Sequence, residues 1–377
     1  IQKWINEEKS HYLVKALSNQ NTPLAEIADA VRRYYHINPE GTDFHSPLKK
    51  GIIVSLVRRF LTDQLEYINI AKNYSEISDF SELLKNMIFP PESHGKLGGK
   101  CAGIFLAKKV VEKMQDVIPE LTGIKIPKTW YITSDGILNF IYYNNLEDVI
   151  EQKYKDIEEI RKEYHHIIQA FKNSNFSKEI TNGLSRALDD FGDTPIIVRS
   201  SSLLEDRMGA AFAGKYKSLF LANQGNKQER LEALMDAIAE VYASTFGPDP
   251  IGYRIERGLI DFNEEMGIMI QEVVGKKVGN YFFPAFAGVA FSYNEFRWSP
   301  RIRRDDGLLR IVPGLGTRAV DRIGDDYPVL IAPGQPDLRV NLTVDEVVGY
   351  SPKFIDVINL KTNTFETISI KSLIKSV

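Results

Sequence analysis

The sequence of 377 residues has little cysteine, no strong excess of charge and no long apolar run. Its single cysteine, Cys101, cannot form a disulfide within the chain, so we expect a buried free thiol and a reducing, cytoplasmic location. Lys and Arg number 47 against 50 Asp and Glu, which argues against the basic surface of nucleic-acid-binding or membrane-binding proteins. No run approaches the roughly 18 apolar residues of a membrane span. Neither nucleic acid nor a membrane is an expected partner.

Apolar periodicity predicts a small all-helical domain at residues 1 to 89. Thr22 and Pro23 are typical of a helix start, and apolar residues between 53 and 68 recur at three- and four-residue spacing. That spacing predicts one helix of about five turns. Because the chain begins with isoleucine rather than methionine, we expect it to be a piece of a longer protein.

A connector rich in Pro and Gly at residues 89 to 95 precedes a region of mixed character. Its patterns predict helices at 98 to 116, 146 to 172 and 228 to 245, and strands at 129 to 133, 196 to 198, 216 to 221, 266 to 274, 286 to 292, 308 to 312 and 354 to 359. No internal repeat or low-complexity tract interrupts them. The mixture indicates an α+β or α/β architecture.

A glycine turn at Gly98, Gly99 and Lys100 opens onto the first of these helices. Glycines let a backbone approach a ligand closely, N–H groups at a helix start attract anions, and a lysine adds a mobile positive charge. The turn therefore has the equipment for binding phosphate. Since it lacks the full G-x-x-x-x-G-K-[ST] motif, a plain structural turn is the alternative interpretation.

Two further segments carry residues suited to phosphate. Arg199 follows a buried-strand pattern, where its guanidinium could reach a ligand crevice or equally form a surface ion pair. Ala213 and Gly214 belong to a small-residue loop that could lay backbone N–H groups on phosphate oxygens, or form a hairpin without a ligand.

Gln271, Glu272, Val273 and Val274 place two polar residues at the end of an apolar strand pattern. Adenine needs an apolar slot with one backbone donor and one backbone acceptor, which the edge of such a strand supplies. An ordinary sheet strand is the alternative interpretation.

Gly314 and Gly316 follow another strand pattern and approach the dinucleotide-binding fingerprint. Gly324 and Pro328 interrupt the helix which that fingerprint requires. The sequence therefore argues against a nicotinamide site here.

The phosphate and adenine segments occur in the same order as in the N-terminal nucleotide-binding domain of the pyruvate phosphate dikinase and phosphoenolpyruvate synthase family. The run from Arg199, Ser200 and Ser201 to Ala213 and Gly214 resembles that family's arginine-to-glycine-loop signature at its normal spacing. The resemblance covers residues 95 to 360 and leaves the helical N-terminus outside it.

This resemblance implies an ATP-grasp fold with a first lobe at residues 95 to 225 and a second lobe at residues 226 to 377. It implies ATP and Mg²⁺ as cofactors, with Lys100 and Arg199 as catalytic contacts of the phosphates. It further implies that nucleotide is held by Gly98, Gly99, Ala213, Gly214, Gln271, Glu272, Val273 and Val274.

The sequence also departs from the family. An acidic residue and a Gln-Thr-Arg strand complete the family's magnesium and phosphate site, and neither is found before Val377. We therefore expect the ATP-binding part of a phosphotransferase, inactive alone, whose partners are downstream phosphohistidine and acceptor domains. A related dikinase with a non-pyruvate acceptor and a non-catalytic nucleotide-binding or regulatory module are the alternatives. The N-terminal helices could pack on the nucleotide lobes, pair with a second copy or bind another protein.

Overall fold

The computed structural model describes residues 11–37, 46–204, 214–262, 264–320 and 326–376. Two compact units are present. The first comprises residues 1–192, 197–219 and 225–272, and the second comprises residues 193–196, 220–224 and 273–377. Each unit is described by itself below.

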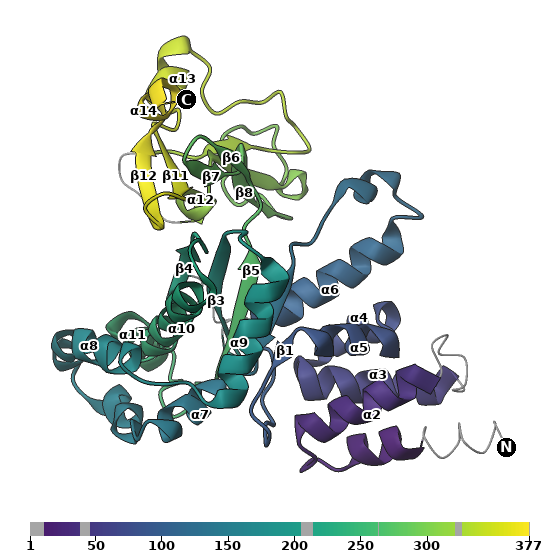
Figure 1. The fold of residues 1–377 in the computed structure, drawn as a ribbon. Helices are drawn as coiled ribbons and strands as arrows, with labels where there is room; N and C mark the ends of the chain where they lie inside the picture. The colour runs from purple at the N-terminus through teal and green to yellow at the C-terminus, as the bar shows by residue number, and fades with distance from the viewer. Residues whose placement is uncertain (1–10, 38–45, 205–213, 263, 321–325, 377) are drawn as a thin grey trace. The chain divides into compact units, whose positions relative to one another are not determined.

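The first unit begins with a layer of helices (Figure 1). Residues 11–18 are helical and are followed by α2 (Leu24–Ile37), α3 (Ser46–Phe60), α4 (Leu65–Tyr74) and α5 (Ile77–Lys85). The prediction of one continuous helix over residues 53 to 68 is wrong, because α3 ends at Phe60 and α4 begins at Leu65.

A five-stranded sheet of order β1-β2-β5-β3-β4 follows the helical layer. Its strands are β1 (Met87–Ile88), β2 (Thr129–Ile132), β3 (Ile196–Ser202), β4 (Ser218–Leu221) and β5 (Met266–Glu272). Strand β1 runs parallel to β2, whereas β2 and β5 are antiparallel with Tyr131 opposite Met269. The strands predicted near 129, 196, 216 and 266 are confirmed within a few residues.

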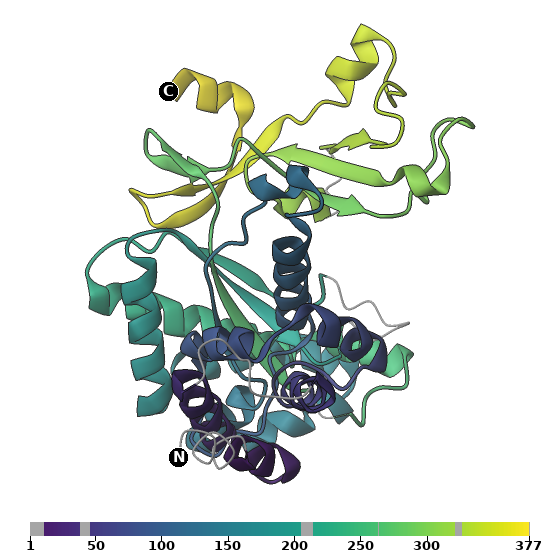
Figure 2. The ribbon, with the colours of Figure 1, turned by 90° about the vertical axis from the view of Figure 1, so that its right-hand side faces the viewer.

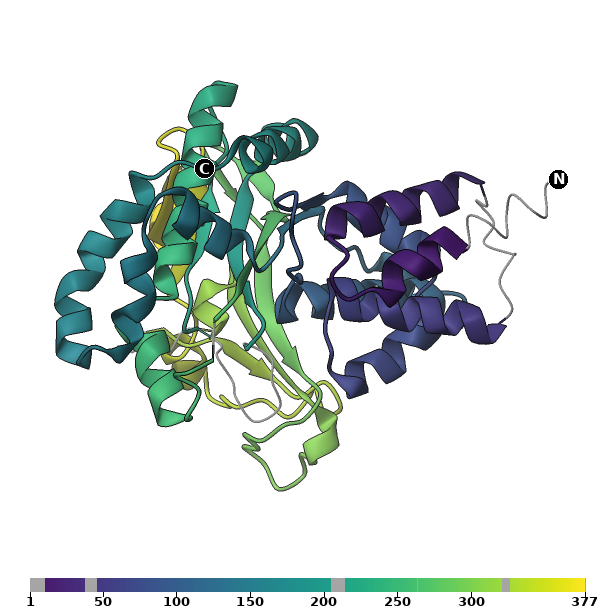
Figure 3. The ribbon, with the colours of Figure 1, turned by 90° about the horizontal axis from the view of Figure 1, so that it is seen from below.

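The remaining helices of this unit are α6 (Gly99–Met114), α7 (Gly136–Tyr143), α8 (Ile157–Lys172), α9 (Lys178–Phe191), α10 (Lys227–Ser244) and α11 (Pro248–Glu256). Short 3₁₀ turns lie at Pro119–Gly123 and Glu147–Tyr154. The predicted helix over 146 to 172 is therefore a 3₁₀ turn followed by α8. Figure 3 shows the sheet between α2–α6 on one side and α8, α10 and α11 on the other.

One hydrophobic core joins the helical layer to the sheet. It runs from Leu13 through Phe60 and Phe80 to Phe105 of α6 and Met269 of β5. Within this core the Phe80 ring lies 6.3 Å from that of Phe60 and 5.4 Å from that of Phe105. The N-terminal helices therefore pack on the region that follows them, which is the first of the three roles considered for them.

The second unit contains a three-stranded and a four-stranded sheet, coloured green to yellow in Figure 2. The first has the order β10-β9-β8, from β8 (Phe286–Phe291), β9 (Leu308–Pro313) and β10 (Val329–Ile331). The second has the order β12-β11-β7-β6, from β6 (Lys276–Val278), β7 (Tyr281–Phe283), β11 (Phe354–Asn359) and β12 (Thr364–Ser369). Helices α12 (Thr317–Val320), α13 (Val344–Gly349) and α14 (Ile370–Ser376) and a 3₁₀ turn at Arg304–Asp306 complete the unit.

The expected α+β class is confirmed, and the predicted strands near 286, 308 and 354 are present. The division into units differs from the expected division into domains, since helices and sheet share one unit up to Glu272 and the second unit resumes at Val273. Within the described ranges, no helix combines the length and apolarity needed to cross a membrane.

Candidate functional site

The start of α6 is built against the end of β3. Gly98, the residue before the first turn, has φ 80°, and a Cβ added there would lie 1.8 Å from the carbonyl oxygen of Ser201. The Ser201 hydroxyl in turn accepts a hydrogen bond from the backbone N–H of Cys101 at 3.1 Å. Ser201 thus caps the helix start, and Cys101 is a buried free thiol as expected.

Lys100 and Arg199, 99 positions apart in the sequence, line the same pocket of about 480 Å³. Both side chains are half-buried, and the Lys100 ammonium donates to the Ser200 hydroxyl at 3.2 Å. The volume lies within the range of about 300–1,000 Å³ that is usual for small-molecule sites. The pocket is lined by Thr62, Gln64, Tyr67, Gly99, Lys100, Ala102, Gly103, Ile104, Arg199 and Met269.

One wall of this pocket comes from the corner between α3 and α4, through Thr62, Gln64 and Tyr67. The Tyr67 hydroxyl donates to the carbonyl oxygen of Ala102 in α6 at 2.7 Å, and burial raises the pKa of Tyr67 far above its usual value. The hydroxyl therefore stays protonated and holds α4 against α6. Sequence reasoning missed these three residues because it ran a single helix through the corner.

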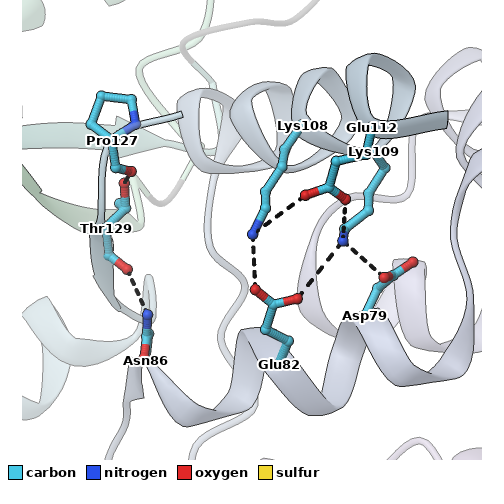
Figure 4. A network of polar contacts seen from close by, with 8 residues as sticks. All are labelled: Asp79, Glu82, Asn86, Lys108, Lys109, Glu112, Pro127 and Thr129. Carbon is cyan, nitrogen blue, oxygen red and sulfur yellow. Dashed lines mark hydrogen bonds and ion pairs between the residues drawn. The ribbon is translucent and has the colours of Figure 1, made fainter. Parts of the chain in front are cut away.

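The described residues that line this pocket include two cations and no carboxylate. A smaller pocket of about 210 Å³ lies further along α6, and both lysines and carboxylates line it. There Lys108 lies 2.9 Å from Glu82, Lys109 lies 2.9 Å from Asp79 (Figure 4), and Lys128 pairs with Asp190. Of the two, the larger pocket has the described lining that suits an anion, because it holds two cations and no carboxylate.

The charges of the smaller pocket hold α5 to α6. Burial disfavours the charge of Lys109, but its hydrogen bonds to Asp79 and Glu112 outweigh this effect and raise its pKa. The pKa of Glu82 is lowered, chiefly by its hydrogen bond from Lys108. This network, drawn in Figure 4, fixes the helix that carries Lys100.

The expected phosphate-covering loop is only partly described. Ala213 lies outside the described residues, whereas Gly214 is exposed and adopts φ 75°, a conformation that favours glycine. The next residue, Lys215, places its ammonium 5.4 Å from the centre of the Tyr253 ring.

The residues expected to hold adenine lie at the passage from the first unit to the second. Gln271 is buried and donates to the Thr129 hydroxyl at 3.0 Å. The backbone N–H groups of Glu272 and Val273 donate to the carbonyl oxygens of Lys128 and Pro195, at 3.0 and 2.8 Å. Neither N–H is therefore open to adenine in this structure.

Val274 is 63% exposed, and none of the four residues from 271 to 274 lines the large pocket. Met269, two residues earlier on the same strand, does line it.

The second glycine turn has a packing role. Gly314 adopts φ 72°, and a Cβ there would lie 2.5 Å from the carbonyl oxygen of Asp356, which accepts a hydrogen bond from the N–H of Leu315 at 2.9 Å. The helix that follows, α12, has only four residues. The segment therefore forms a structural turn within the second unit.

The resemblance implies magnesium, but the described part of the chain contains no cluster of side chains typical of a metal site. No group of three or more His, Cys, Asp or Glu side chains that could hold a metal occurs there. The lining of the large pocket offers hydroxyl and amide groups but no carboxylate, the ligand through which proteins usually hold Mg²⁺. The described residues of this lining therefore do not by themselves form a magnesium site.

Comparison with known proteins gives relatives of two kinds. A phosphoenolpyruvate synthase of Aquifex aeolicus is 24% identical over 42% of this chain and 19% of its own length. A rifampicin phosphotransferase of Bacillus subtilis is 24% identical over 46% of this chain and 19% of its own length. A phosphoenolpyruvate synthase of Escherichia coli is 26% identical over 45% of this chain and 21% of its own length.

In these relatives the matched part is about a fifth of the whole protein. Residues 94–371 also match the family described as the AMP/ATP-binding domain of pyruvate phosphate dikinase. That match includes Lys100, Arg199 and the whole of the sheet after β1, and it begins after the helical layer. The chain belongs to the pyruvate phosphate dikinase AMP/ATP-binding domain family.

Proposed function

We propose that this chain binds ATP and serves as the nucleotide-binding part of an ATP-dependent phosphotransferase. The observation that carries the proposal is the shared pocket of Lys100 and Arg199. An ammonium and a guanidinium in a described lining that contains no carboxylate favour a polyanion, and a guanidinium binds phosphate through two parallel hydrogen bonds. Membership of an AMP/ATP-binding family supports ATP as that polyanion.

In the whole protein, we propose, a phosphoryl group passes from ATP to a histidine on another domain and then to an acceptor. Lys100 and Arg199 would stabilise the charge of the transferred group. Relatives named for phosphoenolpyruvate and for rifampicin match with similar identity, 26% and 24%. The proposal therefore covers the phosphoryl acceptors of both kinds of relative.

The finer assignments belong to the same proposal. Gly98 and Gly99 would present the start of α6 to phosphate, Gly214 with Ala213 would cover it, and the segment from Gln271 to Val274 would face adenine. An ATP-grasp arrangement of two lobes goes with these roles. No step is assigned to Mg²⁺, because the described lining supplies no carboxylate for it.

Calorimetric titration of the 377-residue chain with ATP tests the proposal. We expect Lys100→Ala and Arg199→Ala each to weaken ATP binding by about 10- to 100-fold, since a hydrogen bond to a charged group contributes about 1.5–3 kcal/mol. Arg199→Lys should recover part of the affinity, because it keeps the charge and loses the planar fork.

Matched controls are Lys162→Ala on α8 and Arg186→Ala on α9, two exposed cations outside the pocket. Their affinities should stay within about twofold of wild type. Equal ATP affinity in wild type, Lys100→Ala and Arg199→Ala would overturn the proposal.

A further inference from the structure

We infer that the corner between α3 and α4 is part of the polyphosphate site, with Gln64 in contact with the phosphate chain of ATP. This inference rests on the proposed ATP site. Thr62, Gln64 and Tyr67 line the pocket together with Lys100 and Arg199. They precede residue 94, where the family match begins, so the match assigns them no role.

The corner is attached to the segment that leads into α6. The backbone N–H of Leu97 donates to the carbonyl oxygen of Phe60 at 2.9 Å, and Lys96 forms an ion pair with Asp63. One turn into α4, Tyr67 donates to Ala102 at 2.7 Å. These contacts lie on both sides of the glycine turn that carries Lys100. They therefore fix the position of the corner relative to the backbone of Lys100.

The conformation of the corner is set locally by Thr62. Its hydroxyl accepts from the backbone N–H of Gln64 at 3.2 Å, and the carbonyl oxygen of Gln64 accepts from Ile68 at 3.0 Å. Gln64 is therefore the N-cap residue just before α4, yet its side chain makes no capping hydrogen bond to the helix. The side chain lies in the pocket lining instead.

Chemistry favours the phosphate chain as the part of ATP that Gln64 meets. Its amide can donate two hydrogen bonds to phosphate oxygens without adding charge. The start of α4 adds the partial positive charge of a helix N-terminus beside Lys100 and Arg199. All of these groups favour an anion in the same space.

The test replaces the Gln64 amide by a carboxylate of the same shape. Calorimetry at low ionic strength would measure ATP and inorganic tripolyphosphate binding to the 377-residue chain carrying Gln64→Glu. A new negative charge beside the phosphates should weaken both ligands by about tenfold or more. Asn69→Asp is the matched control, because it makes the same change on α4 at an exposed residue outside the lining.

Weaker binding of both ligands in Gln64→Glu, with Asn69→Asp within about twofold of wild type, supports the inference. Unchanged affinity in Gln64→Glu overturns it, and if Lys100→Ala and Arg199→Ala still lose ATP, the proposed function stands alone. Unchanged affinity in those two variants overturns the proposed function and this inference with it. Should Gln64→Glu fail to fold, Gln64→Ala decides by the same comparison, with about threefold weaker binding expected.

Discussion

Gly98 connects the sequence motif to the packing of the first unit. Glycine at this position was first considered for the close approach of a ligand, but the structure places the carbonyl oxygen of Ser201 directly against it. The hydroxyl of the same Ser201 caps the helix that Gly98 introduces. The turn therefore fixes the backbone position of Lys100, independently of any ligand.

Gly98→Ala tests this packing role. The added Cβ would overlap the Ser201 carbonyl, and φ 80° is unfavourable for alanine, so we expect a loss of about 2–4 kcal/mol in the free energy of unfolding. Gly103→Ala on the same helix is the control, since nothing lies within 4 Å of its added Cβ and it should stabilise by up to about 1 kcal/mol. Urea unfolding measures both, and an unchanged midpoint in Gly98→Ala would contradict the packing role.

Sequence patterns could single out Lys100 and Arg199, because Lys100 follows paired glycines and Arg199 lies between a strand pattern and three serines. The strand itself was predicted too short, since β3 continues through Arg199 to Ser202. The partnership of Ser201 with Cys101 could not be predicted, since it joins residues 100 positions apart. Gln271 is a second residue whose contact could not be predicted from the sequence. The resemblance places Gln271 at adenine, which stays a prediction, whereas its amide donates a hydrogen bond to Thr129 on the neighbouring strand.

Among the elements, the corner between α3 and α4 shows why periodicity misled. Leu61, Leu65 and Ile68 keep the three- and four-residue spacing of one helix face across the break. After α3 ends at Phe60, the Thr62 hydroxyl accepts from the backbone N–H of Gln64, which gives the corner a local alternative to the helical bond. Predicted strands were better placed, because short runs of β-branched residues such as Ile196, Ile197 and Val198 favour a strand.

The ion network between α5 and α6 is an element-scale feature that no pattern predicted (Figure 4). Lys109 is only 8% exposed and lies 2.9 Å from Asp79 and 2.7 Å from Glu112. Its raised pKa means that the contribution of its charge to stability is complete below its ordinary value of 10.5 and is lost only as pH rises through the folded value. At neutral pH the ammonium is therefore fully charged.

Asp79→Asn should accordingly destabilise the chain at pH 7. We expect the free energy of unfolding to fall by about 1–3 kcal/mol, because a mostly buried ammonium loses one of its carboxylates while keeping Glu112. Glu158→Gln provides the control, since Glu158 forms an exposed pair with Arg161 that contributes less than about 1 kcal/mol. An equal decrease in the free energy of unfolding for the two variants in urea would show that the α5–α6 network stabilises the chain no more than an exposed ion pair does.

For the molecule as a whole, a breaker-rich connector at residues 89 to 95 predicts one domain boundary, and the family resemblance implies another after residue 225. The compact units show no boundary at residues 89 to 95, and residues 225–272 belong to the first unit, so that the long segment of the second unit begins only at Val273. Breakers mark the ends of helices and strands, whereas a compact unit is decided by which elements share a core. That sharing depends on contacts such as Phe80 with Phe105, which are 25 positions apart and belong to different elements.

Removal of residues 1–93 tests whether the helical layer is needed by the region that matches the family. The truncation would uncover Phe105, Tyr131 and Met269, which the helices bury in a common core. We expect the shortened chain to lose cooperative thermal unfolding and to bind a hydrophobic dye, as chains with exposed cores do. A cooperative transition at the midpoint of the 377-residue chain would contradict this and would make the helices an independent domain. Because the same helices carry Gln64, such a result would also allow ATP binding to be measured with and without that wall of the pocket.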